Sequence, residues 1–240
     1  MSLLLHRGAQ DIEYDDLKEI PIPKETSSYK PVTHHELADK LKTMTLDLMP
    51  EYAHAQSQYG VTREGQKLFG LHTFQNGDQE LGFSVGFRNS YDRSLSVAVA
   101  LGAQVFVCDN LMLTGDLSVM RKHTANVMDD LENLILSALY RSKTTYRQIK
   151  EDTEGMKEFP MSDDRAYQTL GLAYGRGIIS PRQIPVVKSE WLKPSHDVFE
   201  TRSAWSLYNA FTESMKSTPP GSIMERYLKL HELFKSVAYA

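Results

Sequence analysis

The sequence predicts an α+β fold: an antiparallel β-meander of about four strands, covered by a long amphipathic helix and followed by a mostly helical C-terminal part. Three patterns indicate it. Residues 67–109 alternate with a period of two, residues from Val119 to Ile149 carry an apolar stripe at helical spacing, and helix-capping residues recur after residue 160. We expect an extended arm over residues 1–32 and one domain over residues 33–240, divided into segments 33–155 and 156–240.

The composition is that of an ordinary soluble globular protein. Of the 240 residues, 41% are hydrophobic and 24% charged, and 27 basic against 31 acidic side chains give a net charge of -4. Binding to nucleic acid would therefore need a local basic patch. A single cysteine cannot form an internal disulfide, and the apolar start MSLLLHRG is too short for a signal peptide or membrane span. We expect a cytoplasmic protein with no membrane contact.

The acidic arm contains three prolines and leads into a clear helix start. Thr33 and Glu36 form a capping box, and Leu37, Leu41, Met44 and Leu48 follow at helical spacing. The neighbouring residues His34 and His35 cannot face one metal site from a helix, so we interpret them as a solvated first turn.

The meander consists of strands near residues 68–74, 81–87, 95–101 and 104–108, with a tight turn at Asn76-Gly77. In the second strand, large apolar residues alternate with Gly82, Ser84 and Gly86. A face of such small residues either packs closely against a helix or accommodates a ligand or an extended polymer. We favour a helix, because a sheet needs a covered face, and the long helix that starts near Val119 is the candidate.

The C-terminal part is predicted to be helical with an irregular interruption. A helix begins after Ser162 and points Ala166, Tyr167, Leu170, Ala173 and Tyr174 inward. Residues 178–194, with three prolines, predict a loop or an irregular edge strand. Further helices are expected over residues 204–215 and after a second capping box at residues 222–225.

A polar loop, Arg88–Arg93, joins two apolar strands. Arg88 and Arg93 could bind phosphate and Tyr91 could stack on a base, and Asn89 completes this candidate nucleic-acid site. The loop equally fits a hairpin turn in which Asp92 pairs with an arginine and Asn89 or Ser90 closes the turn. The sequence leaves both interpretations open.

Three further basic candidates follow at Arg121, Lys122 and His123. The pattern places them in the first turns of the long helix, where positive charge opposes the helix dipole. An anionic partner would explain such a placement. We add these residues to the candidate nucleic-acid site.

The sequence predicts no catalytic, metal or cofactor site. It contains no Walker loop, dinucleotide fingerprint, zinc-type cysteine pattern or HExxH motif. Cys108 could act as a nucleophile with His123 as base, but cysteine is among the most buried residue types, and a structural role is favoured.

Several of these segments resemble one protein family. The stretch NSYDRSLSVAVALGAQVFVCDNLM, then RKHT at residues 121–124 and WSLYNAFTE at residues 205–213, resembles the phage and plasmid family called domain of unknown function number 932, over residues 65–235. The family often has glycine after the loop aspartate, where this chain has Arg93. The resemblance implies a mobile genetic element inside a bacterial cell and no established activity.

Three functional hypotheses follow. The first is single-strand DNA binding or annealing in phage or plasmid recombination by a homo-oligomer, because annealing proteins share the outline of hairpins followed by a long helix. The second is a non-enzymatic protein that captures and inhibits a host factor through the acidic arm or an exposed aromatic surface. The third is a hydrolase using Cys108 and His123. The missing motifs favour a protein that is not an enzyme.

Overall fold

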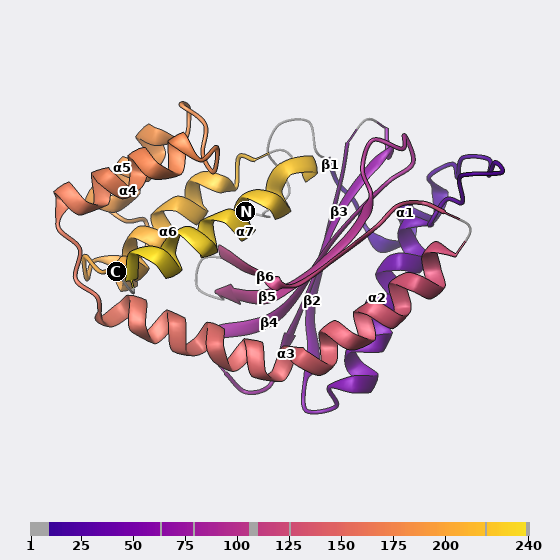
Figure 1. Ribbon diagram of the computed structural model, residues 1–240, viewed down its shortest axis with the longest axis horizontal. Coiled ribbons are helices and arrows are strands. Elements are labelled where there is room, and N and C mark those ends of the chain that lie inside the picture. Colours follow the sequence, from indigo (N-terminus) through magenta and orange to yellow (C-terminus); the bar gives the residue numbers. More distant parts are fainter. Residues whose placement is uncertain are drawn as a thin grey trace.

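A computed structural model describes residues 10–62, 64–78, 80–105, 110–124, 126–218 and 220–238. A twisted sheet lies between helices on both of its faces (Figure 1). The α+β class, the antiparallel sheet and the helical C-terminal part are confirmed.

The sheet is a continuous antiparallel meander in which each strand pairs with the next in the chain. The described residues form β1 (Gln10–Asp11), β2 (Ala53–Thr62), β3 (Lys67–Gln75), β4 (Leu81–Ser90), β5 (Val97–Val105) and β6 (Asn110–Arg121). The sequence did not reveal β2, because Ala53, Ala55 and Gln56 lie on an exposed outer part of the sheet and show no apolar alternation.

β5 and β6 also differ from the expected strands. The break expected at Gly102 does not exist, since β5 continues through it to Val105. A Cβ atom at Gly102 would lie 1.9 Å from the carbonyl oxygen of Met112 on β6, so glycine allows the two backbones to approach closely at a bulge.

Seven α-helices and one short 3-10 helix occur in the described residues. They are α1 (Tyr14–Glu19), α2 (His34–Leu48), α3 (Val127–Glu158), α4 (Asp163–Gly175), α5 (Ile184–Leu192), η1 (Asp197–Phe199), α6 (Ala204–Met215) and α7 (Pro220–Ala238). The predicted caps at Thr33 and Ser162 are confirmed, because each side chain accepts a hydrogen bond from the backbone N–H three residues on.

Different helices cover the two faces of the sheet. On the face with the large β4 residues, the Tyr146 ring of α3 lies 5.8 Å from that of Phe83, and Nε2 of His72 lies 2.9 Å from the Ala38 carbonyl of α2. On the opposite, small-residue face, Arg88 of β4 pairs with Glu225 of α7 at 3.3 Å. A helix does cover the small-residue face, but it is α7 rather than the long helix α3.

The long helix begins eight residues later than the sequence indicated. Val119 belongs to β6, where it pairs with Val99, and α3 starts only at Val127. Arg121 therefore ends a strand, and Lys122 and His123 lie in the connection to α3. The expected opposition between these charges and a helix dipole does not occur.

The amino-terminal arm is partly folded rather than extended throughout. Its described residues form β1, which pairs with β2, and the short helix α1. Leu17, Ile20, Tyr29 and Val32 are buried in the core. The arm therefore belongs to the packed body of the protein.

Two expectations about the C-terminal part are wrong. Residues expected to form a loop contain α5, whose proline lies in the first turn, where its missing N–H costs nothing. In α4, the buried residues are Ala166, Thr169 and Ala173. Tyr167 and Tyr174, expected to point inward, are 40% and 49% exposed.

Gly102→Ala tests the close approach of β5 and β6. We expect a loss of about 3 kcal/mol in unfolding free energy, because the new methyl group meets backbone that cannot move aside. Urea denaturation followed by tryptophan fluorescence measures it. The matched control is Gly171→Ala on α4, where a Cβ meets nothing within 4 Å and the helix gains about 0.5–1 kcal/mol. Equal effects at both positions would contradict this account.

Candidate functional site

Three of the predicted residues, Asn89, Tyr91 and His123, are buried at one end of the sheet, where the β4–β5 loop and the β6–α3 connection lie beside the start of α2. The centre of this cluster is His34. Its ring stacks on Tyr91, with centroids 3.9 Å apart and planes inclined by 8°. The Tyr91 hydroxyl accepts a hydrogen bond of 3.0 Å from the His34 backbone N–H. One ring face of Tyr91 and its hydroxyl group are thus both used in contacts inside the protein.

Hydrogen bonds define the protonation of His34. Nε2 lies 2.9 Å from the Gly65 carbonyl, which can only accept, so Nε2 carries the proton. Nδ1 lies 3.0 Å from the amide nitrogen of Asn89, which also donates to the Val32 carbonyl at 2.6 Å. Burial lowers the pKa of His34 to about 4. His34 is therefore neutral at physiological pH, and the solvated first turn expected here is wrong.

A second group of side chains surrounds Tyr29. The Arg93 guanidinium lies 4.3 Å from the Tyr29 ring centroid, and the His123 ring lies 5.4 Å from it. Lys30 donates a backbone hydrogen bond of 3.2 Å to the His123 carbonyl. Burial lowers the pKa of His123, so this residue is a poor cation for phosphate.

The loop itself is a self-contained turn. Asp92 pairs with Lys67 at 3.7 Å, and it accepts hydrogen bonds from the backbone and hydroxyl of Ser94. Ser90 exchanges hydrogen bonds with the backbone of Leu95, as the turn interpretation expects. Arg93 adopts a φ of 61° at the exposed tip.

The structure separates the seven candidate residues. Asn89, Tyr91 and His123 are buried in the cluster, and Arg88 is buried on the opposite face against Glu225. A base cannot reach the Tyr91 ring face that His34 occupies. The cations that remain accessible are Arg93, Arg121 and Lys122, and Lys30, which the sequence analysis missed, joins them. We call Lys30, Arg93, Arg121 and Lys122 the basic rim.

The rim comes from three separate segments. The backbone hydrogen bond from Lys30 to His123 brings Lys30 close to Lys122, the neighbour of His123. Arg93 lies over the ring of Tyr29, which precedes Lys30. Arg121 ends β6, where it pairs with Val97. Within the part of the chain that the structure describes, none of the four forms an ion pair. The sequence indicated part of this rim through the basic residues 121–123. That Lys30 lies beside them follows only from the fold.

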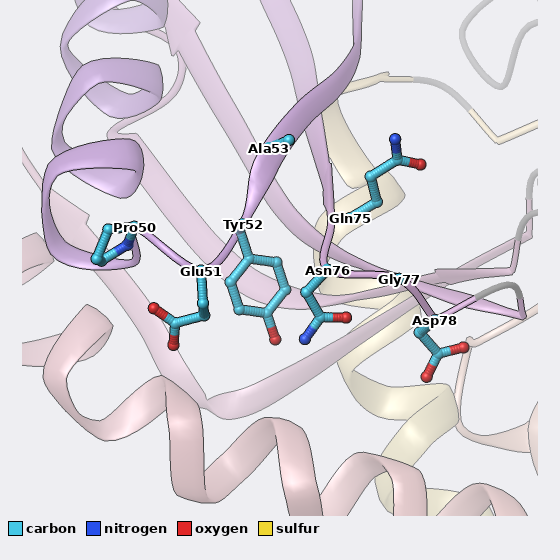
Figure 2. Close-up of a pocket in the computed structure, with 8 residues that line it drawn as sticks. All are labelled: Pro50, Glu51, Tyr52, Ala53, Gln75, Asn76, Gly77 and Asp78. Carbon is cyan, nitrogen blue, oxygen red and sulfur yellow. The ribbon is translucent and has the colours of Figure 1, made fainter.

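A groove lies at the opposite end of β3, beside the Asn76-Gly77 turn. Figure 2 shows Tyr52 in its centre, between Glu51 and Asn76. The cavity measures about 660 Å³ and adjoins one of about 770 Å³ under α3, with Tyr52 and Asn76 shared between them. Burial raises the pKa of Tyr52 to about 12. The two cavities together are lined by five carboxylates and two cations, Arg147 and Lys150, and Lys150 is paired with Asp78 at 2.6 Å, so the excess negative charge disfavours phosphate.

The residues that the structure describes hold no group of three side chains able to bind a metal, and none of their helices is long and apolar enough to cross a membrane. Cys108 and Asp109 lie outside the described residues, so the proposed pairing of Cys108 with His123 has no described geometry.

Comparison with protein families gives a match over residues 24–226, most of the chain, to the model described as Domain of unknown function (DUF932). No curated protein and no solved structure matches.

His34 should make stability depend on pH. The folded state keeps it neutral down to about pH 4, whereas the unfolded chain protonates it near 6.5, so stability falls as pH drops through this window. The loss from this group is about 3 kcal/mol. Urea denaturation between pH 7 and 4 measures it. His34→Gln should be less stable at pH 7 but should lose less stability on acidification; an unchanged pH slope would contradict the assignment.

Tyr91→Phe separates a structural role from base stacking. Removing the hydroxyl leaves the buried His34 N–H without its acceptor, which costs about 1–2 kcal/mol of unfolding free energy. The ring remains, so oligonucleotide affinity should not change. A weaker affinity in this variant at a temperature where it is fully folded would show that the hydroxyl contacts a ligand.

Proposed function

Since the chain belongs to the family described as Domain of unknown function (DUF932), a description that assigns no activity, we propose its function from the geometry: it binds single-stranded DNA at the basic rim. The proposal places it in phage or plasmid recombination, as a single-strand binding or annealing protein.

One observation carries this proposal. The basic rim gathers three exposed cations and the partly exposed Arg121 from three segments, and no described carboxylate pairs with them, in a chain whose net charge is -4. Two described carboxylates, Asp92 and Glu225, pair with cations outside the rim, Lys67 and Arg88. The rim is thus a local basic patch of the kind that an acidic chain needs for phosphate contacts.

The rim supports phosphate contacts rather than base recognition. Tyr91 and Tyr29 are buried, and the outer face of Tyr29 is covered by Arg93. Binding through cations alone releases counterions, so affinity should fall steeply with salt and depend little on sequence. That behaviour fits a protein that coats or pairs single strands.

Annealing also suggests assembly of several copies, and we propose a homo-oligomer. Among the described residues, only Gly60 and Val61 of β2 pair with β1, so the backbone of residues 53–58 is left at an open sheet edge. An open edge can add a strand from another copy. Light scattering with and without oligonucleotide measures the mass.

Capture of a host protein remains the second candidate. The arm exposes five carboxylates, at Asp11, Glu13, Asp15, Asp16 and Glu19, which suit a basic partner surface. This function does not use the basic rim, so variants of the rim distinguish the two candidates.

The triple variant Lys30→Gln, Arg93→Gln and Lys122→Gln tests the rim. We expect affinity for a labelled single-stranded oligonucleotide to fall at least tenfold at low salt, and the slope of log affinity against log salt to drop by about 2, since each phosphate contact contributes roughly 0.7. Fluorescence anisotropy at several salt concentrations measures both quantities.

The matched control is Arg141→Gln, Arg147→Gln and Lys229→Gln, which removes the same charge from exposed positions on α3 and α7. It should bind nearly as the parent protein does. Equal losses in both variants would mean that only the overall charge matters, and absence of binding by the parent protein at low salt would reject the proposal.

A further inference from the structure

Two exposed tyrosines flank an open slot on α4. Tyr167, Gly171 and Tyr174 are four and three residues apart, so they share one face of the helix. A Cβ atom at Gly171 would meet nothing within 4 Å, as would one at Gly175 on the next turn. The two rings are therefore separated by bare backbone, roughly 10 Å apart along the helix axis.

These rings are not part of the core. The inward face of α4 consists of Ala166, Thr169 and Ala173, and the rings point away from it. Figure 1 shows α4 and α5 together at the outer side of the molecule, beyond α6 and α7. Both rings are therefore available for contacts outside the protein.

The same surface is basic on balance. Residues 163–193, from the start of α4 to just past α5, contain five basic and three acidic side chains, a local charge of +2 in a chain of net charge -4. Four of these cations are exposed: Arg176, Arg182, Lys188 and Lys193. Of the three carboxylates, Asp163 pairs with Arg202 at 2.7 Å, and Glu190 accepts hydrogen bonds from the backbone and hydroxyl of Ser195.

Cations and rings lie within reach of the same ligand. Nζ of Lys188 on α5 is 5.9 Å from the centroid of the Tyr167 ring on α4. Arg176 is exposed directly after the end of α4. One cation thus lies beside the Tyr167 ring, and a second follows the helix that carries Tyr174.

We infer that the α4–α5 surface binds single-stranded nucleic acid, with unpaired bases stacking on Tyr167 and Tyr174 and phosphates contacting Arg176, Arg182 and Lys188. The inference extends the proposed function, since it shares its ligand, but it uses a different part of the chain. The basic rim offers charge without accessible rings, and the α4–α5 surface offers both. Only the second can distinguish unpaired from paired bases, because a duplex hides the base faces.

A protein partner is the competing occupant. Leu172, Val186 and Leu192 are also exposed on these helices and could contact an apolar surface. The lysine argues for nucleic acid: protein interfaces are depleted of lysine at their centre, and Lys188 lies beside Tyr167.

The test compares two ligands of about 20 nucleotides, longer than the roughly 4–16 nucleotides of one single-strand site. One is oligo(dT) and the other an abasic strand with the same phosphates. The parent protein should prefer oligo(dT). Tyr167→Ala with Tyr174→Ala should weaken oligo(dT) binding about tenfold for each ring and leave the abasic strand unaffected. The matched control is Tyr140→Ala, at a tyrosine that is 76% exposed on α3.

Each outcome is decisive. Oligo(dT) affinity unchanged in the double variant overturns the inference, and a changed oligomeric mass with unchanged affinity assigns the surface to protein contacts instead. Because all three tyrosines are exposed, denaturation midpoints should match the parent protein and exclude unfolding as the cause. The rim triple variant should weaken both ligands; if it binds normally while the tyrosine variant fails, the rim proposal is rejected and the α4–α5 assignment stands.

Discussion

The structure depends on the complete burial of β4. Every residue of this strand is buried, although it ends in Arg88, Asn89 and Ser90. Buried polar groups must find partners inside the protein, and here two of the three find theirs in distant segments. Arg88 reaches Glu225 on α7, Asn89 reaches the start of α2, and Ser90 closes the following loop. The polar end of one strand thus joins the helical layers on both faces of the sheet.

This burial gives a structural role to residues that the sequence pattern had placed in the nucleic-acid site. The stacking of His34 on Tyr91 and the pairing of Arg88 hold the fold together and leave little of these groups for a ligand. Two sets of side chains remain accessible to a ligand. They are the cations of the basic rim, which have no described carboxylate partner, and the Tyr167 and Tyr174 rings on the outer side of α4. In an acidic chain, such local departures from the average charge are the surfaces on which an anionic polymer can bind.

The two surfaces would contribute differently to binding. Charge alone attracts any nucleic acid and weakens with salt, whereas aromatic stacking needs unpaired bases and is less sensitive to screening. The basic rim lies at the β4–β5 end of the sheet and α4–α5 at the opposite, outer side (Figure 1). A single nucleic-acid strand that contacts both surfaces would have to cross the molecule. The shortest strand able to do so is set by the distance between the two surfaces.

The sequence by itself determined the features that depend on local pattern. Alternation with a period of two predicted the strands from Lys67 onward, and the caps at Thr33 and Ser162 determined where two helices begin. Only the tertiary structure decided that β6 extends to Arg121 and that Tyr167 faces solvent, because strand pairing and the neighbouring helices outweigh local hydrophobicity. The partners of Arg88 and Asn89 come from distant segments, and no local spacing encodes such contacts.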